Sequence, residues 1–142
     1  MIRAVIDTNV IVALLDKKDV HHKRAVTLVQ KLEEEKRDII LMDCIIVELY
    51  SVIARRSRER GYDVSQAFQY IRDIESIYTV LSAYYYRAML HQKIIELMAL
   101  TDGKLSYHDA LIALVMKKRG IKEIATFDKG FEEVDWIQVV SS

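Results

Sequence analysis

The chain contains no proline and only one cysteine, Cys44, among its 142 residues. Without proline, no helix is broken from within by a residue that lacks a backbone N–H. A single cysteine excludes an internal disulfide and fits a reducing cytoplasm. Because Cys44 precedes Ile45 and Ile46, we expect it to be a small buried apolar side chain rather than a reactive thiol.

Long apolar runs are absent as well. No stretch approaches the roughly 18 apolar residues that a membrane-spanning helix requires. Asp7 interrupts the apolar opening where a secretory signal would carry its hydrophobic region, so we expect a cytoplasmic protein. With 51% hydrophobic and 30% charged residues, the composition is that of a folded chain, and residues 1–142 are expected to form one domain.

Net charge is also absent, since 21 basic residues face 21 acidic ones. This balance does not favour a nucleic-acid partner. It does not exclude one either, because the local distribution of charge matters more than its sum. If four of the acids hold a cation, the remaining 17 acids face 21 basic residues, an excess of four positive charges.

Apolar runs alternate with segments of helical periodicity along the whole chain. The runs predict strands at 4–6, 39–42, 77–81, 124–126 and 136–140, and the periodic segments predict helices at 9–15, 21–36, 43–60, 64–75, 84–100 and 106–119. Strands separated by helices predict an α/β three-layer sandwich, in which helices flank a central, mostly parallel sheet of about five strands. Ligands of such sheets bind outside the carboxyl ends of the strands.

Two acids follow predicted strands directly. Asp7 comes after the first strand and Asp128 after the fourth, which places both near the carboxyl edge of the sheet. Each also has a purely structural interpretation. Asp7 could cap the helix that follows it, and Asp128 could belong to an ordinary turn with Gly130.

Glu48 and Asp109 lie on predicted helices. With Ile45 and Val52 at helical spacing, Glu48 is expected within a buried apolar stripe, where a carboxylate needs either an arginine partner or a metal ion. Arg55 and Arg56, two turns away, could supply the ion pair. Asp109 completes a capping box with Ser106, but the apolar helix behind it directs its first turn toward the interior.

Together the four acids predict a metal site. Carboxylates about 5 Å apart repel by roughly 3 kcal/mol per pair, so a cluster needs a cation or protonation of some members. Oxygen ligands favour Mg²⁺ or Mn²⁺, whereas the histidines and Cys44 show no spacing typical of zinc ligands. A metal held by carboxylates activates water and stabilises charge on a phosphoryl group, which favours phosphodiester hydrolysis.

The same segments resemble the PIN-domain family, and within it the VapC-like toxin ribonucleases. Four segments carry the resemblance in order: residues 7–14 (DTNVIVAL), 47–49 (VEL), 108–113 (HDALIA) and 126–131 (TFDKGF). It covers essentially the whole chain. Residues 62–100 carry no motif, so they do not separate a toxin from an RNA-processing relative.

The resemblance implies an endoribonuclease that depends on Mg²⁺ or Mn²⁺. Asp7 and Asp109 would be the principal metal ligands, Glu48 and Asp128 would complete the acidic pocket, and Asn9 and Thr126 would support the acids by hydrogen bonds. Members of the family commonly form homodimers. Toxin members are inhibited by a small antitoxin that fills the cleft and often presents a basic side chain to the acids.

Four alternatives to a toxin ribonuclease share a fold or a pocket of this kind. A phosphoaccepting receiver domain or a haloacid-dehalogenase-type phosphatase would need a further acid after the first strand, where this chain has Thr8 and Asn9. A non-toxin RNA-processing nuclease of the same family remains open. So does a catalytically silent module that binds RNA or protein, although the intact set of four acids counts against it.

Overall fold

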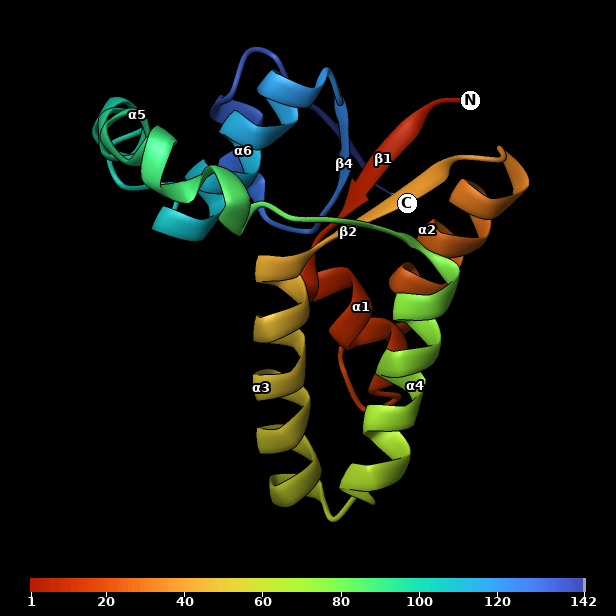
Figure 1. Ribbon diagram of the computed structural model, residues 1–142. Helices are drawn as coiled ribbons and strands as arrows, with labels where there is room; N and C mark the ends of the chain where they lie inside the picture. Colours follow the sequence, from red (N-terminus) through yellow and green to blue (C-terminus); the bar gives the residue numbers. More distant parts are fainter. Residues whose placement is uncertain (142) are drawn as a thin grey trace.

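The computed structural model describes residues 1–141 (Figure 1). Its strands are β1 (Arg3–Ile6), β2 (Asp38–Met42), β3 (Thr79–Leu81), β4 (Glu123–Ala125) and β5 (Gln138–Val140). Its α-helices are α1 (Thr8–Leu15), α2 (His22–Glu34), α3 (Asp43–Arg60), α4 (Val64–Ile77), α5 (Arg87–Leu100) and α6 (Tyr107–Arg119), with short 3₁₀ helices η1 (Tyr84–Tyr86) and η2 (Lys129–Glu133). None of the helices within residues 1–141 combines the length and hydrophobicity that spanning a bilayer demands.

All five strands are parallel and form one sheet in the order β3-β2-β1-β4-β5. This confirms the predicted parallel sheet flanked by helices. The strand expected at 77–81 begins only at Thr79, because Ile77 still belongs to α4. The chain builds outward from β1 to β3 and then returns to the other side of β1, so β1 and β4 form the switch point where ligands bind in such sheets.

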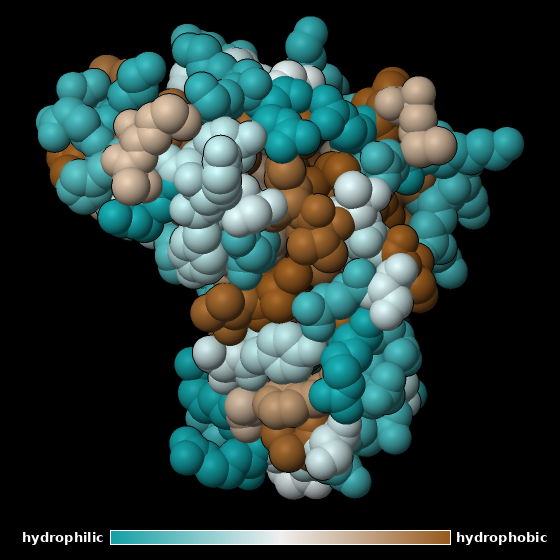
Figure 2. Space-filling model, in the orientation of Figure 1, coloured by the Kyte–Doolittle hydropathy of each residue, from teal (hydrophilic) through white to brown (hydrophobic). Residues whose placement is uncertain are grey.

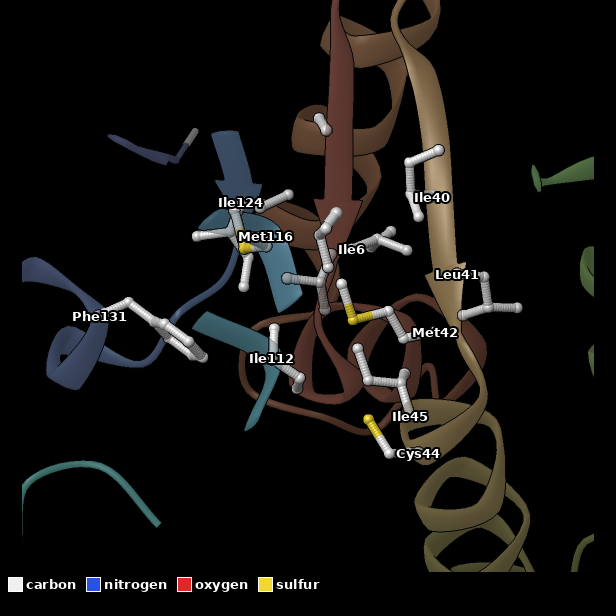
Figure 3. Packing of buried hydrophobic residues seen from close by; sticks show 14 of the residues in the cluster. Ile6, Ile40, Leu41, Met42, Cys44, Ile45, Ile112, Met116, Ile124 and Phe131 are labelled. Atoms are coloured by element: carbon white, nitrogen blue, oxygen red, sulfur yellow. The ribbon is translucent and has the colours of Figure 1, made fainter. Parts of the chain in front are cut away.

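The strands carry apolar side chains on both faces, as a sheet covered by helices on both sides requires. In Figure 1, α5 and α6 lie on one side of the sheet, and α1 to α4 lie on the other. Figure 3 shows the packing, in which Ile6 of β1 lies between Met116 of α6 and Met42 of β2. The expected burial of Cys44 is confirmed, since only 1% of its surface is exposed.

Helices α3 and α4 form a hairpin that projects from the carboxyl edge of the sheet (Figure 1). Gly61 ends α3 with φ of 72°, a left-handed conformation that glycine adopts without steric cost. Figure 2 shows mostly hydrophilic surface on the outer parts of this hairpin and apolar surface across the middle of the same face.

A buried ion-pair network ties the hairpin to the end of α1. Asp16 is 1% exposed and accepts hydrogen bonds from Arg56 (2.9 Å), Arg60 and the Tyr62 hydroxyl (3.0 Å). Arg56 also donates to Asp19 at 2.7 Å. Burial opposes ionisation of Asp16, but the hydrogen bonds from Arg56, the Lys18 N–H and Tyr62 outweigh it and lower its pKa. Arg56 is therefore committed to Asp16 and Asp19 and not to Glu48.

Candidate active site

Asp7 occupies the switch point. It follows β1, and its backbone N–H donates to the Ala125 carbonyl of β4 at 3.0 Å. Only 6% of the surface of Asp7 is exposed. One carboxylate oxygen accepts from the Thr8 N–H at 2.8 Å, so Asp7 does cap α1. The other accepts from the Thr126 hydroxyl at 2.7 Å. The Asp7 side chain therefore caps α1 and also lies at the carboxyl edge of the sheet.

Asn9 and Thr126 hold this carboxylate in place. The Asn9 amide nitrogen lies 3.4 Å from the Asp7 carboxylate and 3.3 Å from the Thr126 hydroxyl. Its carbonyl oxygen accepts from the Phe127 N–H at 3.1 Å. Thr126 in turn accepts from the Asp128 N–H at 3.0 Å. These bonds fasten the loop after β4 to the start of α1, the contacts that a supporting role would require.

Asp109 and Asp128 make the local hydrogen bonds that their structural interpretations predicted. The Asp109 N–H donates to the Ser106 hydroxyl at 3.2 Å, and the Ser106 N–H donates back to the Asp109 carboxylate at 3.4 Å. Asp128 accepts from the Gly130 N–H at 2.8 Å. A Cβ at Gly130 would meet the Lys104 carbonyl at 2.7 Å, so this turn has no room for a side chain.

The expectation that Glu48 lies within a buried apolar stripe was wrong. The buried face of α3 is made by residues spaced mainly by four, namely Cys44, Ile45, Leu49, Ile53 and Ser57. Glu48 lies about 100° around the helix from Leu49 and is exposed. None of the ion pairs within residues 1–141 involves it, so neither Arg55 nor Arg56 neutralises its charge.

Electrostatic coupling links the four acids nonetheless. Burial, and then the charges of Asp109 and Glu48, raise the pKa of Asp7 to about 7, although hydrogen bonds from Thr126 and Thr8 oppose the rise. Burial and the charge of Asp128 raise the pKa of Asp109. Partial desolvation of its carboxyl group and the charge of Asp109 raise the pKa of Glu48. Negative charges that penalise one another's ionisation define a place where a cation is favourable.

Within residues 1–141, no three His, Cys, Asp or Glu side chains are close enough together to hold a metal ion as a direct cage. This arrangement still fits Mg²⁺, which usually keeps several waters and binds through only one or two carboxylates. The donor set consists of oxygens, and Asp7 is the buried member whose ionisation a cation would favour most.

His108, which begins the HDALIA segment and shows no zinc-ligand spacing, lies beside the acids. Its charge lowers the pKa of Glu48 and of Asp109. Its ring nitrogen is 3.4 Å from the Tyr84 hydroxyl. His108 could have been found from its position next to Asp109 in the sequence. The contact of Tyr84 with His108 comes from a separate segment, and no sequence pattern predicts it.

The raised pKa of Asp7 predicts that this residue destabilises the metal-free protein at neutral pH. Between pH 4 and 7 the unfolded chain ionises Asp7, whereas the folded chain keeps it protonated. The free energy of unfolding of the wild type is therefore highest, as far as Asp7 is concerned, below pH 4, and it falls as the pH rises to about 7. The free energy of unfolding of Asp7→Asn, relative to wild type in EDTA, should therefore rise over this range by up to roughly 4 kcal/mol. Urea denaturation at several pH values measures the difference.

Glu34→Gln, which changes an exposed acid on α2, is the matched control and should follow wild type at every pH. A constant difference between Asp7→Asn and wild type across the range would show that Asp7 does not ionise abnormally.

This chain is similar to known proteins in sequence and in fold. The PIN domain family matches residues 4–137. Ribonuclease VapC1 of Aquifex aeolicus (strain VF5) is 27% identical over 137 residues, covering 96% of this chain and 88% of that protein. None of the four predicted acids, at positions 7, 48, 109 and 128, lies outside the range that the family matches.

Two solved structures share the architecture over nearly their full length. Mycobacterium tuberculosis VapC20, described as a toxin that cleaves the sarcin–ricin loop, superposes with a TM-score of 0.71 at 22% identity, covering 98% of this chain and 99% of that one. DNA-bound VapBC from Salmonella typhimurium gives 0.70 at 18% identity, covering 99% and 98%. The resemblance seen in the four sequence segments is thus confirmed: the protein belongs to the PIN-domain family.

Proposed function

We propose that the protein is an endoribonuclease that depends on Mg²⁺ or Mn²⁺ and acts as the toxin of a VapBC-type toxin–antitoxin pair. The observation that carries the proposal is the placement of Asp7, a buried carboxylate with a pKa of about 7 at the switch point of the sheet. Such a group is costly unless a cation or a proton balances it. Residues 1–142 would form a single nuclease domain.

In this proposal Asp7 and Asp109 are the principal metal ligands, and Glu48 and Asp128 complete the acidic pocket directly or through water. A bound divalent ion would activate a water molecule and stabilise the charge that develops on the phosphoryl group. Asn9 and Thr126 hold the Asp7 carboxylate by hydrogen bonds of 3.4 and 2.7 Å, so its oxygens keep their direction. Because the direction of its oxygens is fixed, Asp7 would hold a bound ion without reorganising.

The relatives support the biological part of the proposal. One is named a ribonuclease, and the solved neighbours include VapBC complexes from Salmonella typhimurium and Rickettsia felis. A basic side chain of an antitoxin would reduce the repulsion among the carboxylates of the acidic pocket. We further propose that the toxin is a homodimer and acts in the cytoplasm, the compartment that suits a chain with one buried cysteine.

Metal removal tests the proposal directly. Cleavage of a mixture of structured and unstructured RNAs by the purified chain should require Mg²⁺ or Mn²⁺, fall to background in excess EDTA and return when either ion is restored. Gel analysis of end-labelled RNA also shows whether the cuts are internal, as an endonuclease requires.

Equal cleavage with and without EDTA would contradict the metal-dependent mechanism. If the folded chain binds these RNAs but cuts none of them in either ion, the catalytically silent binding module becomes the better interpretation.

A further inference from the structure

A groove of about 430 Å³ runs beside the acids. Asn9 and Glu48 lie along it, so it opens directly onto the proposed catalytic pocket. Its other wall residues come from α1, from the turn before α2, from α3 and from the loop after β4: Thr8, Val12, Asp19, His21, Val52, Arg55, Arg56 and Phe127. The groove therefore continues the site along α3, and a chain bound at the acids would extend into it.

Of the two arginines that line the groove, Arg55 is the one whose charge is available. Glu48, Val52 and Arg55 are spaced by four and three residues, so they lie along one face of α3, with Arg55 about 10 Å from Glu48 along the helix axis. Arg56 and Asp19 also line the groove, but they pair with each other at 2.7 Å. The Arg55 side chain is exposed, and none of the ion pairs or side-chain hydrogen bonds in the described range 1–141 involves it.

An aromatic pair stands in the same groove. The rings of His21 and Phe127 are 5.3 Å apart, and the Arg24 guanidinium lies 4.5 Å from the centre of the Phe127 ring. Arg24 also contacts the His21 ring at 3.3 Å. The backbone of Phe127 is fixed by the Asn9 carbonyl at 3.1 Å, and the same Asn9 amide contacts Asp7. The position of the ring is therefore tied to the position of the proposed first metal ligand.

We propose that this groove binds the single-stranded RNA that flanks the scissile phosphate, with Arg55 pairing a backbone phosphate and a base packing against Phe127 and His21. The inference rests on the proposed ribonuclease function. A positive charge that follows the backbone together with aromatic rings for the bases is the combination that single-stranded nucleic acids require. Arg55 and Phe127 are substrate-binding residues, separate from the four acids.

Binding of a fluorescently labelled, unstructured RNA of mixed sequence to the full chain in EDTA tests the proposal, because no cleavage interferes. Arg55→Gln should weaken binding about tenfold and reduce the slope of log affinity against log salt by about 0.7, the value for one lost phosphate contact. Arg58→Gln, on the same helix but outside the groove, is the matched control and should change neither quantity.

Phe127→Leu tests the aromatic part. It should weaken binding about tenfold while leaving the salt slope unchanged, since stacking involves no counterion release. Phe68→Leu, a half-buried phenylalanine on α4, is its control. Thermal unfolding of each variant distinguishes a lost contact from a lost fold.

Equal affinities for Arg55→Gln and Arg58→Gln, with wild type binding normally, would overturn the groove proposal and leave the ribonuclease function standing. Failure of the wild-type chain to bind RNA in EDTA would overturn it as well, whatever the cleavage assay with Mg²⁺ shows. If Arg55→Gln weakens binding as expected but the wild type cuts no RNA in Mg²⁺ or Mn²⁺, the groove stands and the proposed catalysis fails.

Discussion

Replacing Asp7 by Asn is expected to lower the rate of RNA cleavage by about a thousandfold or more while the protein stays folded. A metal ion contributes several kcal/mol of charge stabilisation to the transition state, and each 1.4 kcal/mol corresponds to a factor of ten. Asn retains an oxygen that can accept from the Thr8 N–H, so α1 keeps its cap. Initial rates on one RNA at saturating Mg²⁺, with circular dichroism of each variant, measure the effect.

Asp109→Asn should cause a loss of similar size. Asp135→Asn, which neutralises an exposed acid that is not one of the four site acids, is the matched control and should cut RNA as wild type does. A variant at position 7 that retains wild-type rates would remove this residue from the catalytic site and, with it, the main support for the mechanism.

Removing the Asp16 carboxylate is expected to cause the largest loss of stability among these substitutions. Asp16→Ala leaves the guanidinium groups of Arg56 and Arg60 and the Tyr62 hydroxyl without their buried acceptor. Breaking one side of a buried ion pair typically costs about 3–5 kcal/mol, and the partial exposure of the two arginines reduces this to about 2–3 kcal/mol. Urea denaturation at neutral pH measures the free energy of unfolding.

Asp19→Ala provides the comparison, because Asp19 shares Arg56 with Asp16 but is more exposed and accepts only one arginine hydrogen bond. Its loss should cost less than half as much. If the two variants were equally stable, the network would not fasten the hairpin to α1, and Arg56 would be free to act in the neighbouring groove.

The spacing of apolar residues and the positions of glycines in the sequence were sufficient to predict the fold. The apolar runs of β1, β2 and β4 and the glycines that end α3 and α6 are local signals, and the structure places elements where they predict them. The strand at β3 was placed two residues early, because Ile77 reads equally well as the end of a helix or the start of a strand. A short apolar run cannot separate the two.

The site was only partly predictable. Asp7 and Asp128 follow strands, so the topology of a parallel sheet brings their segments to one edge. The environment of Glu48 was misjudged because flanking apolar residues at helical spacing do not fix which face of α3 is buried. Tertiary contacts decide this, and they bury Leu49 and Ile53 while Val47 remains 55% exposed.

The assignment of the arginines of α3 depended on contacts distant in the sequence. Arg56 is bound by Asp16, which lies 40 positions earlier, so no local pattern could show that Arg56 is occupied and Arg55 is not. The groove that Arg55 lines combines four separate segments of the chain. Only the folded chain brings them together.

The three contacts of the Asn9 side chain restrict which amino acid can occupy position 9. Its nitrogen donates to Asp7 and Thr126, and its oxygen accepts from the Phe127 N–H. An aspartate would lack the donor and add a repelling charge, a leucine of similar size would leave the Phe127 N–H without an acceptor, and a glutamine would be one methylene too long. The carboxamide of asparagine therefore links a carboxylate to a peptide N–H, because it can donate to the first and accept from the second. Position 9 should be nearly as intolerant of substitution as the acids, although it carries no charge and takes no part in the chemistry.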